Sequence, residues 1–414
     1  MDEEREITQR LWSGYIPLEL HLAPADAVEL LASPTLPEPF QTFYILAPQG
    51  SYLPFLTKRI REQWLDPLWT LGTTTPGVGA AKDPINESDF WFDVDGVPLK
   101  WHYPIGLLYD IHENAVPLAQ RAMRENDRKR GDSISTSTSA KKRTDSGDSR
   151  RHSRASLDEA QAEDRVCIPW RLTLHLRKFP ADKLIRSPSS QAIRDIYMSM
   201  VKEVGQRYDN TEMADYLRFG STKRVMDLSK ADQTQLLDGL ESHSFEQYHA
   251  IHTLLSSMPN VSSMDNDSGL PRHIPVRWYL LPRGSFQPEH VVVVQDLISP
   301  VHAVKDKATA ARGSLAVAPR GSQANGAWVT LAEAFKQVYP SAVPLPVDDE
   351  NSNKSNAAGK NSKDSEDDPS ALVAKRWKCW SQGIQPPWNT PLIWMSSNLA
   401  YPDGFLHIIL VESR

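Results

Sequence analysis

This 414-residue chain has two cysteines and twelve histidines, which could supply the nucleophile and the base of a thiol enzyme. A thiol enzyme needs a cysteine of lowered pKa beside a histidine base. Cys379 instead stands between aromatic neighbours in Trp377-Lys378-Cys379-Trp380, and apolar surroundings raise the pKa of a thiol. Neither cysteine is accompanied by a glycine-rich nucleophile elbow, a phosphate-binding loop or an HExxH motif. We therefore expect Cys167 and Cys379 to be small apolar strand residues, with a thiol enzyme as the less favoured alternative.

His102 is a candidate catalytic base in a hairpin rich in aromatic residues. It lies between Trp101 and Tyr103, and a histidine with such neighbours more often caps a packed corner than abstracts a proton. We therefore expect a structural role for it. Two cysteines are also too few for a zinc module built from CxxC pairs, so the sequence predicts no metal and no cofactor.

Lys202 is a candidate for a reactive amine. It follows Ile193 by nine positions in a predicted helix, and at about 100° per residue it falls half a turn from the centre of the apolar stripe. Spacing alone therefore predicts an ordinary lysine that points to solvent. With a pKa of about 10.4 its amine is mostly protonated at neutral pH, so acyl transfer to it needs a partner that positions and deprotonates it.

A basic, serine-rich stretch runs from Arg121 to Ser156. Clusters such as Lys141-Lys142-Arg143 suit acidic lipid or nucleic acid, but the serines and threonines dilute this charge and favour a solvated tail. Arg150-Arg151-His152-Ser153 has the pattern that basophilic kinases prefer, which makes Ser153 a candidate phosphorylation site. The formal net charge of -6 argues against general affinity for nucleic acid.

The length of 414 residues predicts two or three domains. The start Met1-Asp2-Glu3-Glu4-Arg5 is acidic where a secretory signal would be basic and then apolar. No apolar run approaches the roughly 18 residues that span a bilayer. We therefore expect a cytoplasmic protein.

The first part of the chain predicts the element order strand, strand, helix, strand, strand, short helix, strand. The elements are expected over Tyr15 to Leu22, Thr42 to Leu46, Ser51 to Trp64, the two arms of a hairpin around Asp95-Gly96, a helix started by Pro104, and Trp170 to Arg177. This is the order of a ubiquitin-like β-grasp domain.

The last third repeats this order with different residues. The elements are expected over His273 to Leu281, Val291 to Val294, a helix capped by Thr330 and Glu333 and stopped by Pro340, Ala374 to Ser381, Pro391 to Leu399, and Phe405 to Val411. Between the two arrays, residues from Ser189 to about Met258 predict helices, one of them from about Ser244.

These patterns predict an α+β fold with two ubiquitin-like β-grasp domains that flank a helix-rich domain. The expected units are an N-terminal helix over 1–13, a first ubiquitin-like domain over 14–186, the helix-rich domain over 187–262 and a second ubiquitin-like domain over 270–414. Polar, low-complexity composition predicts long disordered loop insertions at about 118–165 and 346–370.

Two motifs are long and specific. The hairpin carries a WF-x-x-x-G-x-PLKWHYPIG-type string, and the chain ends with Pro391-Leu392-Ile393-Trp394 and Tyr401 to Ile408. Both resemble the autophagy protein 5 family, as do Arg272 to Arg277 and the segment Tyr197 to Glu203. The signature positions, which we expect to be mainly structural, are Trp91, Gly96, Pro98, Leu99, Lys100, Trp101, His102, Tyr103, Pro104 and Gly106.

This resemblance implies that Lys202 is the isopeptide acceptor for the C-terminal glycine of the ubiquitin-like autophagy protein 12. It implies a non-catalytic scaffold whose domains share a groove for a helix of autophagy protein 16. It also implies an E3-like complex, recruited peripherally to the preautophagosomal structure membrane, that promotes transfer of an autophagy protein 8 family modifier to phosphatidylethanolamine in autophagosome formation. An unconjugated ubiquitin-like adaptor remains the alternative.

Overall fold

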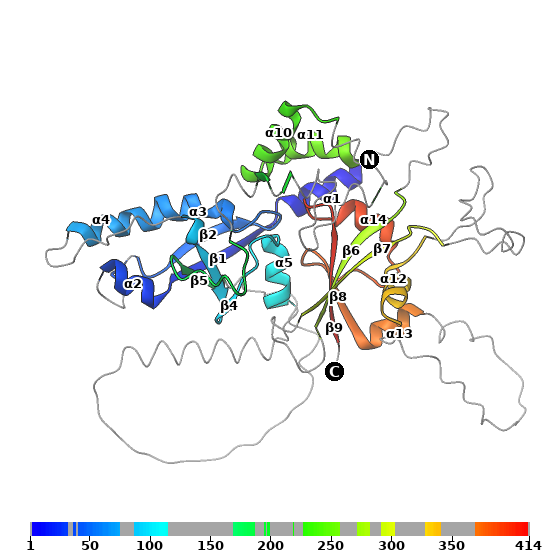
Figure 1. Cartoon of the computed structure of the whole chain (residues 1–414). Coiled ribbons are helices and arrows are strands. Elements are labelled where there is room, and N and C mark those ends of the chain that lie inside the picture. The colour runs from blue at the N-terminus through cyan, green and yellow to red at the C-terminus, as the bar shows by residue number, and fades with distance from the viewer. Residues whose placement is uncertain are drawn as a thin grey trace, which may run out of the picture.

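The computed structural model describes residues 2–31, 36–38, 40–74, 87–114, 169–186, 194–195, 197–198, 218, 227–256, 271–281, 291–302, 328–340 and 369–412. These residues form an α+β molecule with two sheets and a helical unit beside both of them (Figure 1). The expected fold class is confirmed. The predicted insertion at 118–165 and positions 346–368 of the second one lie outside the described residues.

The first sheet has the strand order β2-β1-β5-β3-β4, with β1 parallel to β5 and the other pairs antiparallel. Its strands are β1 (Tyr15–Leu22), β2 (Phe43–Pro48), β3 (Trp91–Val94), β4 (Val97–Pro98) and β5 (Trp170–His175). The alternation predicted for β1 is confirmed, because Ile16, Leu18, Leu20 and Leu22 are all buried in the core of this domain. This arrangement is the mixed sheet of a β-grasp fold.

The helix that covers this sheet is longer than its sequence pattern predicts. It begins as α3 (Pro54–Ile60), passes through a π-helical turn at Arg61–Leu65, and continues as α4 (Asp66–Thr74) beyond the expected end at Trp64. Pro67 would disrupt a regular α-helix because it lacks an N–H and its ring meets the carbonyl four residues earlier. The π-helical turn lies directly before it, where local widening accommodates such a break.

Of two further helices in the first domain, one was predicted from the sequence and one was not. The short helix α5 (Ile105–Tyr109) follows Pro104 as predicted and continues as a π-helical turn, Asp110–Asn114. The helix α2 (Pro24–Leu31) was not expected. The sequence signal for this helix is Pro24 in its first turn. The structure shows in addition that the carboxylate of Asp26 is buried and accepts a hydrogen bond from the Leu176 amide at 3.0 Å.

The second sheet has the order β7-β6-β9-β8, with β6 parallel to β9. Its strands are β6 (Ile274–Leu281), β7 (Val292–Ile298), β8 (Trp377–Trp380) and β9 (Leu406–Glu412). It is accompanied by α12 (Leu331–Val338) and α14 (Leu392–Asn398). The capping box predicted for α12 is present, since the Thr330 hydroxyl accepts from the Glu333 amide and the Glu333 carboxylate accepts from the Thr330 amide.

The strand expected over Ala374 to Ser381 is partly wrong. Residues Ala374 to Arg376 belong instead to a helix, α13 (Pro369–Arg376), which also takes in the last two residues of the predicted insertion. Ala, Lys and Arg are strong helix formers, and cations in the last turn favour the carbonyl end of a helix. Only Trp377–Trp380 pair with β9.

The helical unit contains α10 (Lys230–Glu241) and α11 (Phe245–Ser256), and the N-terminal helix α1 (Asp2–Trp12) runs beside them (Figure 1). The indole of Trp12 stacks on Tyr248 with 4.5 Å between ring centres. The two helices approach closely at Gly239, where a Cβ would lie 2.6 Å from the Tyr248 amide nitrogen. In the described part of the chain, no helix combines the length and apolar character needed to cross a membrane.

Candidate functional site

The signature hairpin begins with Trp91, which ties β3 to β5. Its indole lies flat on His175 with 3.6 Å between ring centres, and its N–H donates to the Arg177 carbonyl at 2.9 Å. The turn places Asp95 at φ 52° and Gly96 at φ 82°, as a two-residue hairpin turn requires. The Gly96 amide donates to the Asp93 carboxylate at 2.9 Å, and Pro98 pairs with Asp93 across the ladder. The predicted hairpin is therefore confirmed.

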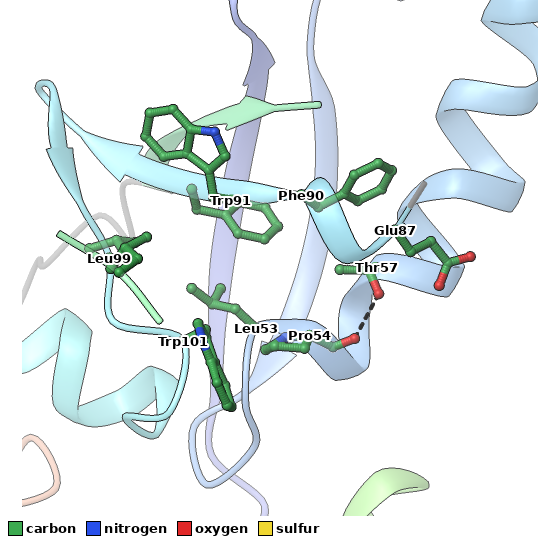
Figure 2. A pocket seen from close by; sticks show the side chains of 10 residues that line it. Leu53, Pro54, Thr57, Glu87, Phe90, Trp91, Leu99 and Trp101 are labelled. Atoms are coloured by element: carbon green, nitrogen blue, oxygen red, sulfur yellow. Dashed lines mark hydrogen bonds between the residues drawn. The ribbon is translucent and has the colours of Figure 1, made fainter. Parts of the chain in front are cut away.

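Leu99 and Trp101 line a small cavity between the hairpin and the start of α3 (Figure 2). The cavity holds about 30 Å³, room for no more than one or two water molecules. The indole N–H of Trp101 donates to the carbonyl of Ile185, and Leu184 closes the same cavity. Trp101 therefore anchors the chain that leads from the first domain toward the helical unit.

Lys100, His102 and Tyr103 form the corner after the hairpin. The Lys100 ammonium lies 5.4 Å from the centre of the Tyr103 ring, and His102 meets the edges of Trp101 and Tyr103. Burial, together with the positive charges of Lys100 and Arg277, lowers the pKa of His102 to about 4. A histidine that is neutral and this weakly basic at pH 7 suits packing better than proton abstraction.

Pro104 and Gly106 place α5 against the second domain. Pro104 precedes the first helical residue with φ −55°, and the Gly106 amide donates to the Gln49 carbonyl at 2.7 Å. A Cβ at Gly106 would lie 2.8 Å from the Tyr401 hydroxyl and 3.0 Å from the Gln49 carbonyl oxygen. Glycine is required here because two domains occupy the space of a side chain.

The C-terminal motif meets this corner with a buried polar cluster. His407 Nε2 lies 2.9 Å from the Asp403 carboxylate, and its Nδ1 lies 2.9 Å from the Tyr279 hydroxyl. The Arg277 guanidinium stacks 3.8 Å over the Phe405 ring and stands 3.7 Å from Asp403. Burial opposes ionisation of Asp403, but His407 and Arg277 outweigh it and hold the pKa of this carboxyl below its ordinary value.

The two specific motifs therefore face each other across the domain interface. Tyr103 packs edge-on against Tyr279, and the Gly383 amide donates to the buried Asp110 carboxylate at 2.8 Å. An apolar cluster spans both domains and contains Leu107, Ile111, Tyr279, Leu281, Tyr401, Ile409 and Val411. The sequence pattern assigned one buried face to β6, whereas both faces are buried. The near-continuous apolar run of β6 was the signal for this second contact.

The helical unit joins the same place through the turn Pro402–Gly404. The Pro402 carbonyl accepts from the hydroxyls of Tyr197 at 2.9 Å and Tyr248 at 3.3 Å. The Arg218 guanidinium donates to the Gly404 carbonyl at 2.7 Å. The helical unit is thus bound to the turn that directly follows Tyr401, the residue that lies against Gly106 of the first domain.

Four residues that the sequence singled out for their reactivity are not part of this junction. Three of them, Lys202, Ser153 and Cys167, lie outside the described residues. Cys379 is buried in β8, and burial raises the pKa of its thiol well above the ordinary range, so it is a poor nucleophile. Among the described residues no group of three His, Cys, Asp or Glu side chains is placed to hold a metal ion.

Three family models match the chain in sequence order. "Autophagy protein ATG5, UblA domain" matches residues 11–176, "Autophagy protein ATG5, alpha-helical bundle region" matches 190–258, and "Autophagy protein ATG5, UblB domain" matches 273–410. Together these matches take in the signature hairpin, the Lys202 segment and the C-terminal motif.

Individual relatives give the same result. Autophagy protein 5 of Coccidioides immitis is 32% identical over 307 residues, which cover 71% of this chain and 74% of that protein. Autophagy protein 5 of Phaeosphaeria nodorum is 28% identical over 416 residues and 98% of each chain. The crystal structure of Kluyveromyces marxianus Atg5 is similar with a TM-score of 0.54 and 16% identity over 99% of both chains, which supports the fold.

Proposed function

Because the chain belongs to the autophagy protein 5 family and thus has a role in autophagy, we propose that it is a scaffold conjugated through Lys202 to the ubiquitin-like autophagy protein 12. The observation that carries this proposal is the match of all three family domain models in order, with Lys202 inside the 190–258 match. The segment before Lys202 supports it, since Tyr197 and Met198 are buried and fix the chain in the helical unit.

The chemistry asked of Lys202 is aminolysis of a thioester. Its amine attacks the carbonyl carbon that joins the modifier to the cysteine of a conjugating enzyme, the C–S bond breaks, and an amide forms. The thiolate leaves with the electron pair, and the amine loses a proton. At neutral pH this amine is mostly protonated, so the conjugating enzyme supplies the base and this chain supplies the position.

We propose that the chain itself has no catalytic residue. The state of Cys379 supports this proposal, because a buried thiol of raised pKa does not form a thioester readily. The weakly basic His102 supports it as well, since it lies in the packed corner of the hairpin. The chain then acts by holding other proteins in place.

The partners proposed for the conjugate follow from the family. A helix of autophagy protein 16 binds a groove shared among the domains. The hydrogen bonds between domains, at Pro402 and Gly404 and between Asp110 and Gly383, support a fixed groove. The complex promotes transfer of an autophagy protein 8 family modifier from its conjugating enzyme to phosphatidylethanolamine. It works in the cytoplasm and is recruited peripherally to the preautophagosomal structure membrane.

Substitution of the acceptor tests this proposal. Lys202→Arg keeps the positive charge but cannot form the stable amide, so a denaturation-resistant band of higher mass should disappear completely on gels of cell extracts. Lys230→Arg, a change at an exposed lysine that begins α10, should leave the band unchanged. Persistence of the band in Lys202→Arg would reassign the acceptor, and absence of the band in the unsubstituted protein would favour the unconjugated adaptor.

A further inference from the structure

Residues 11–14, at the end of α1, contact all three domains. Leu11 packs on the core of the second ubiquitin-like domain, where α1 also touches α14. Trp12 packs on the core of the helical unit. The Leu11 carbonyl accepts a hydrogen bond from the Gln49 side chain of the first domain, and the Gly14 carbonyl accepts one from the Gln49 amide at 3.0 Å. We call residues 11–14 the N-terminal clasp.

On one side the clasp is bound to the helical unit through Trp12. The indole stacks on Tyr248 with 4.5 Å between ring centres, and its N–H donates to the His243 carbonyl at 3.3 Å. The indole also stacks on the His243 ring at 5.1 Å, although His243 has a φ of 56°, in the left-handed region that favours glycine. The stack on Trp12 explains why a side chain is present at this strained position.

On the other side Gln49 connects the clasp to the second ubiquitin-like domain. Its carbonyl accepts from the Gly106 amide at 2.7 Å, and the Tyr401 hydroxyl lies against that glycine. Tyr401 directly precedes Pro402, whose carbonyl accepts from the Tyr248 hydroxyl at 3.3 Å. The contacts therefore form a closed ring, which runs from the clasp through Gln49 and Gly106 to this turn and returns through Tyr248 to the clasp.

We propose that the N-terminal clasp is a conformational device that closes this ring, so that opening it at one contact weakens the docking of all three domains. In a closed ring each contact holds the groups of the next one close together, which lowers the entropy lost in forming it. Toward the start of α1, Arg5 pairs with Glu246 at 3.0 Å, but both side chains are more than half exposed, and such pairs add little stability. The inference goes beyond the proposed function and does not depend on conjugation at Lys202.

Gly14 offers a way to open one contact of the clasp selectively. A Cβ at this position would lie 2.7 Å from Cδ of the Gln49 side chain, so Gly14→Ala displaces that carboxamide from the Leu11 carbonyl. The φ of Gly14 is outside the left-handed region, so alanine can adopt the same backbone. In Gln49→Ala the displaced group is absent. The effects of the two substitutions should therefore not add.

The experiment measures hydrogen exchange of the Gly383 amide by NMR in the full-length chain. This amide donates to the Asp110 carboxylate at 2.8 Å across the boundary of the two ubiquitin-like domains, and it is not a member of the ring. Gln49→Ala and Trp12→Leu should each speed its exchange about three- to tenfold, because the docking that protects it is weakened by about one contact. Gly14→Ala should match Gln49→Ala, and the double variant should exchange no faster than either single one.

Trp69 provides a matched control, because its indole is partly buried like that of Trp12 but packs on the core of the first domain. Trp69→Leu should leave the exchange unchanged. Unchanged exchange in Gln49→Ala or Trp12→Leu, or equal acceleration in Trp69→Leu, would overturn the clasp, and so would additive effects of Gly14→Ala and Gln49→Ala. If circular dichroism shows that Trp12→Leu is unfolded, Trp12→Phe replaces it. Its acceleration should be smaller, since a ring remains to stack on Tyr248, and no acceleration would again contradict the proposal.

Discussion

Gly106 shows how a single residue of the signature is determined by contacts between domains. The Tyr401 hydroxyl occupies the place of its Cβ, and the Gln49 carbonyl closes the same space from within the first domain. No local backbone requirement explains a glycine inside α5, where glycine lowers helix stability. The residue is therefore explained by the approach of the second domain, which a local pattern does not reveal.

We expect Gly106→Ala to lower the free energy of unfolding by about 1–3 kcal/mol, because the added methyl group forces the Tyr401 side chain or the Gln49 backbone to move. Urea titration measures this change. Gly50→Ala is the control in the same interface, since its Cβ would lie 3.6 Å from Pro402 in ordinary contact. A Gly106→Ala protein as stable as Gly50→Ala would contradict the packing described for this corner.

The lowered pKa of His102 leads us to expect that the stability of the protein depends on pH. Its pKa is lowered to about 4 in the folded protein, while an unfolded histidine titrates near 6.5. Between these values the unfolded chain binds more protons, so stability falls as the pH drops from about 6.5 to about 4. In His102→Gln the slope of unfolding free energy against pH in this window should decrease by up to one proton. An unchanged slope would show that His102 titrates alike in both states.

The residue-level expectations succeeded where the cause is local. Alternation along Tyr15–Leu22 and the Asp95-Gly96 turn need only strand periodicity and the permitted φ angles. Burial of Cys379 was likewise evident from its aromatic neighbours. The partners of Asp403, His407 and Tyr279 could not be foreseen, because they depend on which strand lies beside which.

At the scale of elements, a capping motif at the start of a helix predicted that helix correctly. The capping box predicted at Thr330 is present and satisfies amides that a helix start leaves without partners; the box at Ser229 does the same for α10 and was not predicted. Where the length of a strand depends on the strand it pairs with, the hydrophobic pattern of the sequence was less informative. The strand β7 extends to Ile298, beyond its expected end at Val294, because it pairs with β6 over its whole length.

Removal of the α12 cap should be measurable. Thr330→Ala loses the hydroxyl that accepts from the Glu333 amide, and we expect the free energy of unfolding to fall by about 1 kcal/mol. Chemical denaturation followed by tryptophan fluorescence provides the measurement. Thr234→Ala, in the exposed interior of α10, should be neutral or slightly stabilising. Equal effects of the two substitutions would argue against the cap.

At the scale of the whole molecule, three domains meet around residues 401–404, with the first domain at Tyr401 and the helical unit at Pro402 and Gly404. The order of the elements along the chain correctly predicted two β-grasp domains around a helical unit. This was possible because each domain has its own core, and the residues of that core recur with the spacing of strands and helices. Their docking was not predictable from these patterns, since the interface joins residues as far apart in sequence as Asp110 and Gly383, which are 273 positions apart. The two motifs that carried the family resemblance turn out to form this interface.

The docking joins parts of the chain that are distant in sequence. Tyr197 and Arg218 donate hydrogen bonds to the turn Pro402–Gly404, Gly106 lies against Tyr401 directly before that turn, and Tyr103 packs on Tyr279 of β6. The proposed scaffold would act through position alone, and the buried thiol of Cys379 and the weak base His102 agree with this proposal.

The most direct measurement is mass spectrometry of the chain isolated from native cells under denaturing conditions. We expect a covalent product larger by one ubiquitin-like modifier, with a tryptic peptide over 195–207 that is uncleaved after Lys202 and carries the modifier's C-terminal residues there. Recovery of the chain only at its own mass, or of a branch at another lysine with peptide 195–202 unmodified, would contradict this expectation.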